Sequence, residues 1–418
     1  MSVETADVIV AGAGPGGAAT AAWLASAGRD VILLEKDRFP RDKVCGDGLT
    51  PRVVKELLDL GLVDEASGRV PGWATQQGLR IHGGHTVMEL PWPTLDDWPN
   101  WGATATRRVF DDRLATEAVK RGAQLREGVT ATAPLRRPGS GRIHGVAWRD
   151  DQGNSGQLLA PIVVAADGAG AGLAKQVGLT RRPDRPMAVA ARGYWKSKRS
   201  GDDWISSFLN LSDADGNLLS GYGWIFPLDD GTINVGLGLL NTSKDFQGTN
   251  YRKMLQAWAT GMEAEWETSP DNQVDGLRTG PIPMGFNRTP LHRDGLLLVG
   301  DSGGFVNPFN GEGISYAMEA GHLAAEIVDG ALARRRTADL DAYDVELRHR
   351  WGGYYQLGNV FTHLVGDPDV MKILTTYGMP YRPLMELVFK LMAHLTDTRP
   401  SDAKDLVINT LQRMAPAA

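Results

Sequence analysis

The chain has 418 residues, of which 42% are hydrophobic and 22% are charged, a composition typical of a soluble globular protein with two or three structural units. Its net charge of −6 argues against a nucleic-acid partner, and its single cysteine and scattered histidines exclude an internal disulfide and predict no metal site. The first predicted strand begins within ten residues of the N-terminus and no apolar run approaches the ~20 residues that span a bilayer, so we expect a cytoplasmic protein without a signal peptide.

A dinucleotide-binding βαβ unit is predicted in residues 7–36. Its parts follow in the required order: an apolar strand, a glycine-rich turn, an alanine-rich helix, a second apolar strand and an acidic residue. Gly12 allows the tight turn, Gly14 lets the backbone approach a pyrophosphate, and Gly17 lets the helix pack closely on the strand. Glu35 is placed to accept hydrogen bonds from ribose hydroxyls, which favours FAD or NAD over NADP.

The rest of the chain alternates between this nucleotide domain and a second unit rich in predicted strands. We therefore expect an α/β fold: a Rossmann-like domain, an inserted antiparallel β-sheet domain that binds the substrate, and a helical C-terminal extension. The predicted boundaries are 1–75, 104–180 and 286–333 for the first, 76–103 and 181–285 for the second, and 334–418 for the third.

Two later strands end in motifs that can meet the glycine turn. Residues 163–168, VVAADG, form a strand that ends at Asp167-Gly168. Residues 296–313, LLLVGDSGGFVNPFNGEG, form a strand that ends at Gly300-Asp301 and leads through a loop into a long helix. Because ligands of open α/β sheets lie at the carboxyl ends of the strands, all three motifs can converge on one dinucleotide. No second glycine turn of this type follows a strand, so we expect one such cofactor.

These motifs, together with Arg107-x-x-Phe110-Asp111, resemble those of FAD-dependent oxidoreductases with the p-hydroxybenzoate hydroxylase fold. Residues 39–52, FPRDKVCGDGLTPR, and residues 221–227, GYGWIFP, are similar to the flavin-flanking segment and the YxWxFP substrate-cavity motif of geranylgeranyl reductases. Residues 379–397 resemble that family's C-terminal extension. The variant KVCGDGLTPR resembles menaquinone reductases, which saturate one isoprene unit of a quinone tail.

The resemblance implies FAD as the cofactor and a set of residues that bind it. This set is Gly12, Gly14, Pro15, Gly16, Gly17, Glu35, Lys36, Cys45, Gly46, Asp47, Arg107, Asp167, Gly168, Gly300, Asp301, Pro308, Gly311, Gly313 and Ile314. Asp301 is expected to hold the ribityl chain or the pyrophosphate, and the backbone of residues 311–314 to face the flavin N1/C2 carbonyl. The turn that begins at Cys45 is expected beside the isoalloxazine ring.

The reaction implied is the saturation of C=C bonds in a polyprenyl chain, on a prenyl diphosphate, a prenyl lipid or a menaquinone, by a hydride from the flavin and a proton. The candidate catalytic residues are Cys45, Tyr222 and Trp224, with Cys45, Tyr222 or a bound water as the proton source. The expected partners are the hydrophobic isoprenoid substrate and an electron donor, NAD(P)H or a ferredoxin-type protein. A lipid substrate also suggests peripheral association with the inner face of the membrane.

Several features have two interpretations. Cys45 is either a small buried hydrophobe or part of the active-site wall. Tyr222, Trp224 and Phe226 alternate along a strand and share one face, which is either a substrate tunnel or sheet core. The apolar stripe of residues 384–395 either docks on the protein's own core or lies on a membrane surface.

The roles of four charged residues also have more than one interpretation. Arg41, Lys43 and Arg52 are either solvated loop charges or ligands of a pyrophosphate headgroup. Glu312 stands where many flavoproteins of the fold have a smaller residue, and its carboxylate would oppose the charge on a reduced flavin unless it turns away.

Three other functions share most of these motifs. The first is an FAD-dependent aromatic monooxygenase. The second is a flavin-dependent halogenase, because GYGWIFP distantly resembles the GWxWxIP of that class, although no lysine stands at an obvious relay position and Lys55 is the nearest candidate. The third is an electron-transfer flavoprotein that turns over no carbon substrate.

Overall fold

The computed structural model describes residues 4–63, 70–212, 219, 221–243, 246–400 and 402–415. Its central layer is a six-stranded sheet in the order β19-β20-β13-β2-β3-β9, in which β19 runs antiparallel to β20 and all other neighbours run parallel. The strands are β2 (Val8–Ala11), β3 (Val31–Glu35), β9 (Gln124–Glu127), β13 (Ile162–Ala165), β19 (His292–Arg293) and β20 (Leu296–Leu298). The central strands are buried and almost wholly apolar, as expected for parallel strands covered on both faces.

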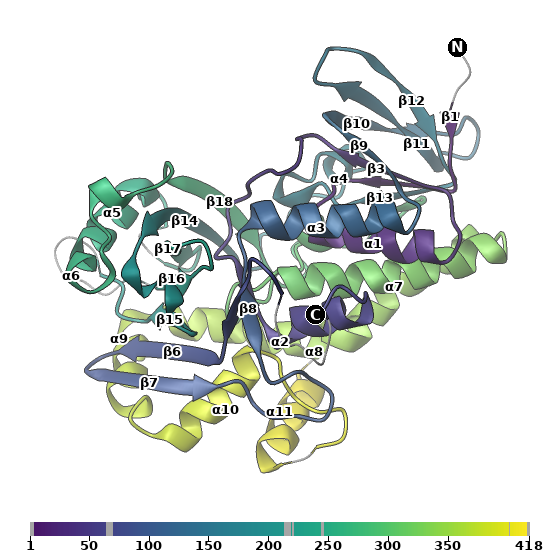
Figure 1. The fold of residues 1–418 in the computed structure, drawn as a ribbon. Coiled ribbons are helices and arrows are strands. Elements are labelled where there is room, and N and C mark those ends of the chain that lie inside the picture. Colours follow the sequence, from purple (N-terminus) through teal and green to yellow (C-terminus); the bar gives the residue numbers. More distant parts are fainter. Residues whose placement is uncertain are drawn as a thin grey trace.

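Helices cover one face of this sheet and a second sheet covers the other (Figure 1). Alternation along β2 divides its side chains between them: Val8 and Val10 pack with the helices, and Ile9 packs with the second sheet. The first face carries α1 (Pro15–Ser26), α3 (Arg107–Lys120) and α7 (Ile314–Ala333); the second carries β1 (Glu4–Thr5), β10 (Val129–Arg136), β11 (Ile143–Asp150), β12 (Ser155–Leu159) and α4 (Gly172–Gln176). The Rossmann-like layer predicted from the sequence is confirmed.

The inserted, mainly antiparallel sheet predicted from the sequence is also confirmed, with seven strands in the order β18-β14-β17-β16-β15-β6-β7. All neighbours run antiparallel except β15 and β6, which run parallel. The strands are β6 (Gly78–Gly83), β7 (Thr86–Pro91), β14 (Met187–Lys196), β15 (Trp204–Phe208), β16 (Gly221–Pro227), β17 (Thr232–Leu240) and β18 (Arg278–Pro283). An apolar cluster that includes Val235, Leu255 and Trp266 joins this sheet to α5 (Tyr251–Gly261) and α6 (Glu263–Trp266).

A small three-stranded sheet, β4-β8-β5, connects the two larger parts. Its strands are β4 (Gly48–Leu49), β5 (Ala74–Gln76) and β8 (Gly102–Thr104). On one side β8 contacts α2 (Pro51–Asp59), and on the other the Thr104 hydroxyl donates to the Pro227 carbonyl at the end of β16. This sheet carries the Cys45–Gly48 turn to the junction of the two parts.

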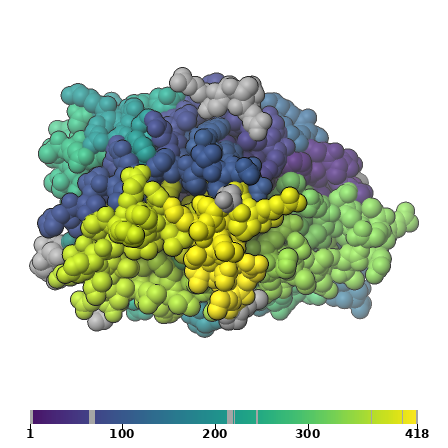
Figure 2. Space-filling model, turned by 90° about the horizontal axis from the view of Figure 1, so that it is seen from below, coloured from purple at the N-terminus to yellow at the C-terminus, as the bar shows by residue number. Residues whose placement is uncertain are grey.

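The C-terminal region is helical, as predicted. It comprises α8 (Ala342–Val365), α9 (Pro368–Ile373), the π-helix η6 (Leu374–Gly378), α10 (Arg382–Met392) and α11 (Ala403–Met414). The short 3-10 turns of the described residues are η1 (Gly168–Gly170), η2 (Lys198–Gly201), η3 (Pro270–Asn272), η4 (Gly300–Ser302) and η5 (Thr337–Asp341). Seen from below, the C-terminal helices cover much of one face of the molecule (Figure 2).

The apolar stripe of α10 docks on the protein's own core, one of the two interpretations of the sequence. Met385 and Phe389 are buried, and the Phe389 ring lies 5.2 Å from that of Trp92. Among the helices of the described residues, none combines the length and the apolar character needed to cross a bilayer.

Candidate functional site at the junction of the two sheets

The glycine turn joins β2 to α1 at the carboxyl edge of the six-stranded sheet. Gly12 has a φ of +102°, and a Cβ at this position would lie 2.3 Å from the Ala166 carbonyl oxygen. A Cβ on Gly17 would lie 1.8 Å from the Gly12 carbonyl oxygen. At Gly14, by contrast, a Cβ would meet no atom closer than 3.8 Å. The fold itself therefore requires Gly12 and Gly17, whereas Gly14 leaves room for a group that approaches the backbone.

A largely buried network of charges stands beside this turn. Glu35, at the end of β3, accepts hydrogen bonds from the Ala13 backbone N–H (3.0 Å) and from Arg41 (3.1 Å). Arg41 also donates to Asp111 (2.6 Å), which accepts two further bonds from Arg107 (2.7 and 2.6 Å). The two guanidiniums hold the pKa of Asp111 below its usual value despite its burial. Two carboxylates thus balance two arginines, and the ends of both guanidiniums are fixed about 4 Å from the Cβ position of Gly14.

The Cys45–Gly48 turn lies against the aromatic face of β16. A Cβ on Gly46 would lie 3.1 Å from the Phe226 ring and 3.3 Å from the Trp224 indole nitrogen. The ring centroids of Tyr222 and Trp224 are 5.9 Å apart, and those of Trp224 and Phe226 are 6.4 Å apart, so these side chains follow one another along one face. The two stretches that resemble geranylgeranyl reductases are therefore in direct contact, although some 175 residues separate them.

Cys45 itself is half-buried at this contact. Its sulfur accepts a hydrogen bond from the Asp47 backbone N–H at 3.3 Å. Burial raises the pKa of the Cys45 thiol, although the Arg107 guanidinium acts to lower it; the neighbouring Asp47 carboxyl adds to the rise. The thiol therefore keeps its proton at neutral pH.

Asn234, on β17, ties the turn to the aromatic face. Its amide nitrogen donates to the Cys45 carbonyl and to the Asp47 carboxyl, both at 2.8 Å, and its oxygen accepts from the Trp224 indole at 2.9 Å. The Tyr194 hydroxyl adds a fourth bond to this group by donating to the Asp47 carboxyl at 2.6 Å. Neither Asn234 nor Tyr194 was predicted from the sequence. One signal was available, because a lone amide in the apolar strand TINVGLGLL must have buried partners.

Asp47 is the most constrained member of this group. It is fully buried with a φ of +65°, and burial raises its pKa to about 6 even though the hydrogen bonds from Tyr194 and Asn234 lower it. Both bonds go to Oδ2, while the buried Oδ1 has no partner among the described residues. A buried oxygen without a donor is costly, so a group from outside the chain is expected to satisfy it.

The loop before α7 closes the site from the other side. The Tyr222 hydroxyl donates to the Asn310 carbonyl at 2.6 Å, and a Cβ on Gly311 would lie 3.4 Å from that hydroxyl. Burial raises the pKa of Tyr222 to about 12. Glu312 accepts a hydrogen bond from the Thr50 hydroxyl, and burial raises the pKa of its carboxyl. Protonation therefore offers a way to remove the charge conflict that the sequence raised for Glu312.

The remaining predicted residues divide into two groups. Asp301 lies near the site, with its carboxylate 2.8 Å from the Lys43 ammonium and 3.7 Å from the Cβ position of Gly313. Asp167 accepts the Leu173 backbone N–H at the start of α4 (3.0 Å), and Gly168 and Gly300 have left-handed φ values. For three others the structure shows only local packing: Lys36 is exposed beside Asp37, Pro308 packs against Gly358 of α8, and Ile314 is buried in the core.

Both interpretations of Arg52, as a solvated loop charge and as a ligand of a pyrophosphate headgroup, are wrong. It is buried, pairs with Glu319 through two bonds (3.0 and 2.6 Å) and donates to the His394 carbonyl at 2.8 Å. It is neither solvated nor free to bind a headgroup. Arg41 is likewise not a solvated charge, since it is largely buried in ion pairs with Glu35 and Asp111. Lys43 pairs with Asp301, but its side chain is 42% exposed, so both interpretations of Lys43 stay open.

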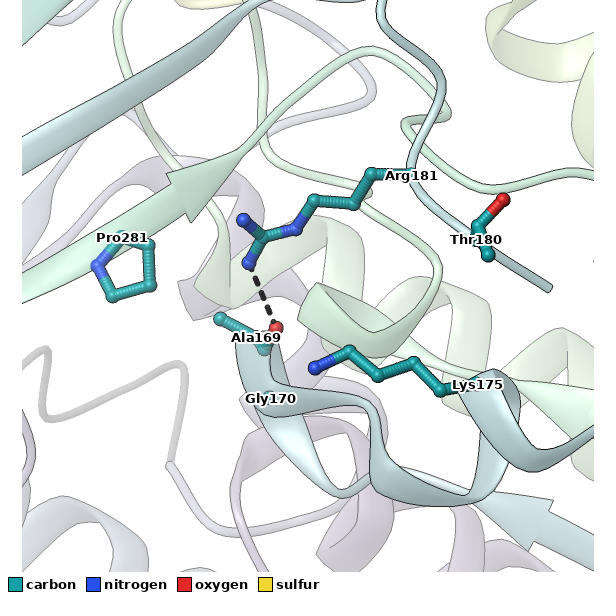
Figure 3. Close-up of a pocket in the computed structure, with 6 residues that line it drawn as sticks. All are labelled: Ala169, Gly170, Lys175, Thr180, Arg181 and Pro281. Carbon is teal, nitrogen blue, oxygen red and sulfur yellow. Dashed lines mark hydrogen bonds between the residues drawn. The ribbon is translucent and has the colours of Figure 1, made fainter. Parts of the chain in front are cut away.

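A surface pocket of about 370 Å³ opens next to the Asp167-Gly168 turn. Arg181 and Lys175 extend towards the backbone of Ala169 and Gly170, and Arg181 donates to the Ala169 carbonyl at 3.0 Å (Figure 3). The pocket is lined by Ala169, Gly170, Lys175, Thr180, Arg181 and Pro281. Two cations and a small apolar wall suit an anionic ligand.

The geometry fits an FAD. The open cradle at Gly14 and the fixed arginines suit a pyrophosphate, and Glu35 retains acceptor capacity for a ribose. The unpartnered Oδ1 of Asp47 and the aromatic face of β16 lie where the rest of a flavin and an apolar substrate would meet.

Comparisons with known proteins agree with this geometry. The family model described as FAD binding domain matches residues 5–352. A menaquinone reductase of Mycolicibacterium smegmatis is 35% identical over 397 residues, which make up 95% of this chain and 93% of that protein. A geranylgeranyl bacteriochlorophyll reductase-like protein of Thermoplasma acidophilum has a TM-score of 0.77 at 20% identity, with 98% of this chain and 100% of that chain covered. A myxobacterial chondrochloren halogenase has a TM-score of 0.72 at 23% identity, with 98% and 96% covered. At these identities the two solved structures share the fold alone.

Proposed function

Since the chain belongs to the FAD-binding domain family and, within it, to the FAD-dependent prenyl reductases related to menaquinone reductase, we propose that it saturates a C=C bond in the isoprenoid tail of a menaquinone. The observation that carries this proposal is the 35% identity over nearly the full length of both chains. The contact between the Cys45–Gly48 turn and the aromatic face of β16 supports it, because it builds an apolar wall beside the cofactor site.

When bound, FAD supplies the hydride that one carbon of the double bond receives. We assign the pyrophosphate to Gly14, Arg107 and the N-terminus of α1, where free N–H groups favour an anion. Glu35 would hold the ribose, and Asp301 the ribityl chain. The backbone of residues 311–314 would face the flavin edge.

An isolated double bond also needs a proton and a dry, well-aligned cavity. We propose the Cys45 thiol as the proton source, since Cys45 begins the turn that contacts the aromatic face of β16 and its sulfur carries a proton at neutral pH. Tyr222 is less suited, because its hydroxyl is committed to the Asn310 carbonyl. Trp224 and Phe226 would exclude water and align the isoprenoid chain.

The electron donor belongs to the same proposal. The pocket that carries Lys175 and Arg181 is suited to the phosphates of a nicotinamide nucleotide. We therefore favour NAD(P)H over a ferredoxin-type protein. Replacing both cations by glutamine should raise the KM for NAD(P)H and leave reduction by dithionite unchanged.

The alternatives are a monooxygenase and a halogenase. The lysine nearest to a halogenase relay, Lys55, lies on the exposed side of α2 and pairs with Asp59 at 3.0 Å, which disfavours that function. The monooxygenase shares the whole cofactor site, so only chemistry separates it from a reductase.

The deciding experiment is anaerobic. The purified flavoprotein is reduced with dithionite and mixed with a short-chain menaquinone, geranylgeranyl diphosphate or a geranylgeranylated glycerolipid. Flavin reoxidation with a gain of two hydrogen atoms in the menaquinone tail, and with neither other substrate, is the expected result. Reoxidation by another prenyl substrate would reassign the headgroup. A flavin that stays reduced until oxygen is admitted would exclude the reductase and favour the monooxygenase.

A further inference from the structure

A second pocket, of about 270 Å³, opens between α8 and the segment of residues 181–186 that leads into β14. We call it the α8 pocket. It shares no lining residue with the pocket that carries Lys175 and Arg181. Most of its side chains are polar, so their hydrogen bonds indicate what kind of ligand fits. The pocket is lined by Asp184, Arg185, Gln356, Asn359, Val360 and His363.

Arg185 is the buried cation of the α8 pocket, with only 7% of its surface exposed. Its Nη1 atom donates to the Gln356 side-chain oxygen at 3.3 Å. The same atom donates to the Asn359 side-chain oxygen, in the amide orientation that gives both ends of Asn359 a partner. The Nε atom, by contrast, has no hydrogen-bond partner among the described residues. A buried donor without an acceptor is costly, so this side of the guanidinium is suited to a ligand from outside the chain.

The carboxylate nearest to Arg185 does not neutralise it fully. Asp184 Oδ2 lies 3.6 Å from Nε, and the same carboxylate accepts two hydrogen bonds from Arg182 (3.0 and 2.5 Å). No other carboxylate of the described residues forms an ion pair with Arg182 or Arg185. A third arginine, Arg348, pairs with Asp344 of its own helix at 3.2 Å. Arg182 and Arg185 together therefore carry one positive charge more than the carboxylate that they share.

The electrostatics of Arg185 favour an additional anion. Burial lowers the pKa of Arg185, and the charges of Arg182 and Arg348 lower it further, against the effect of Asp184. The guanidinium is thus less well stabilised than an arginine in water, and an anion beside it would restore the lost stabilisation.

The other lining residues suit a phosphate group with an organic substituent. The Gln356 amide carries two N–H donors besides the oxygen that Arg185 binds. Val360 is 52% exposed and forms an apolar wall of the pocket. A planar guanidinium matches the geometry of phosphate oxygens, and a phosphate group alone would fill only part of the volume.

We propose that the α8 pocket binds a phosphate group, as free phosphate or as the phosphate monoester of a small metabolite, through the Nε side of Arg185. Phosphate suits the pocket better than a carboxylate ligand, because its additional oxygens can also accept from the Gln356 amide. The ligand would join the segment of residues 181–186 to α8, so its binding should raise the melting temperature.

The test is calorimetric titration of the full-length, FAD-loaded protein with inorganic phosphate and with phenyl phosphate, at constant ionic strength. Arg185→Gln should weaken phosphate binding roughly tenfold, since a charge-assisted pair is lost. Arg350→Gln, at a partly exposed arginine of the same helix, is the matched control and should bind as the parent does. Asp184→Asn removes the negative charge next to the ligand and should tighten binding, which a merely damaged fold would not do.

The variant K175Q/R181Q separates the two pockets, and phosphate binding that it retains belongs to the α8 pocket. Binding that is unchanged in Arg185→Gln, or that disappears in K175Q/R181Q, would overturn the proposal, as would no binding at millimolar phosphate. If Arg185→Gln does not fold, Asp184→Asn decides, and an affinity no higher than that of the parent refutes the site. Tighter binding of phenyl phosphate than of phosphate supports a monoester as the ligand, and binding of phosphate alone supports the free ion. The titration needs neither an electron donor nor a prenyl substrate, so its outcome is independent of the proposed function.

Discussion

Burial and hydrogen bonding shift the pKa of the Asp47 carboxyl in opposite directions. Burial raises its pKa from 3.8 to about 6, so the folded protein holds this proton more tightly than the unfolded chain does. The stability that this group contributes is therefore fully present below about pH 4 and is lost as the pH rises through about 6. Asp47→Asn cannot ionise and should escape this loss.

We expect the unfolding free energy of Asp47→Asn, measured relative to that of the parent, to rise by about 3 kcal/mol from pH 4 to pH 8. The reason is that each unit of pKa difference between the folded and unfolded states corresponds to about 1.4 kcal/mol. Denaturant unfolding at several pH values measures this difference. Asp271→Asn, at an exposed position, serves as the control and should show no comparable trend. A constant difference between Asp47→Asn and the parent across the range would contradict the raised pKa.

Asn234 is the residue on which the alignment of the site depends. Asn234→Ala removes the hydrogen bonds to Cys45, Asp47 and Trp224 at once. Because small displacements of reacting groups cost much rate, we expect kcat to fall on the order of 10- to 100-fold while FAD remains bound. The loss of the hydrogen bond from Asn234 should also raise the pKa of Asp47.

Steady-state kinetics measures the change in kcat, and flavin absorbance shows that FAD remains bound. Asn154→Ala, at an exposed position, is the control. If Asn234→Ala is as active as the parent, Asn234 does not align the site.

At the scale of elements, the glycine turn separates what the fold needs from what the cofactor needs. Gly17→Ala places a methyl group against the Gly12 carbonyl and should prevent folding. Gly14→Ala meets no close protein atom, so it should fold with a normal melting temperature and bind FAD at least tenfold more weakly. Gly201→Ala, in open surroundings, should change neither property. Circular dichroism and flavin titration distinguish the three, and normal FAD affinity in Gly14→Ala would place the pyrophosphate elsewhere.

The elements that the sequence predicted well are those whose contacts are local. The strand, turn and helix of residues 8–26 follow from glycine spacing and apolar runs, and Glu35 meets Ala13 only 22 residues away. Asn234 was not predicted as a site residue because its partners, Cys45 and Asp47, lie 189 and 187 residues away in the sequence. No local sequence pattern predicts that β17 of the seven-stranded sheet will contact the Cys45–Gly48 turn, which follows β3 of the six-stranded sheet.

The same reason explains the correction at Arg52. A cation that follows a polar loop is usually solvated, and nothing near it in the sequence announces a partner. Glu319 lies 267 residues further on and His394 lies 342 further on. Only the packing of α2 against α7 and the C-terminal region brings the three together.

At the scale of the whole molecule, Arg52 of α2 joins three parts of the fold, because it binds Glu319 of α7 and His394 of the C-terminal region. Its side chain also lies over the rings of Trp98 and Tyr316, at 4.6 and 5.1 Å. Arg52→Leu leaves Glu319 without its partner in a buried place and should cost about 3–5 kcal/mol of unfolding free energy. The double variant R52L/E319L removes the stranded carboxyl and should recover much of this loss.

Denaturant unfolding measures both variants, and limited proteolysis should cut the C-terminal helices of the single variant first. If Arg52→Leu is as stable as the parent, the ion pair contributes nothing to the attachment of this region.

The strand order carries a consequence for how the molecule is made. The glycine turn leaves the ribosome before β13 and β20, which complete its sheet, and before α7, which packs on α1 and follows roughly 300 residues later. At about 5–20 residues per second, the nascent chain carries a finished nucleotide turn for roughly 15–60 s before its last neighbours exist. Flavin loading is therefore expected only after α7 has left the ribosome.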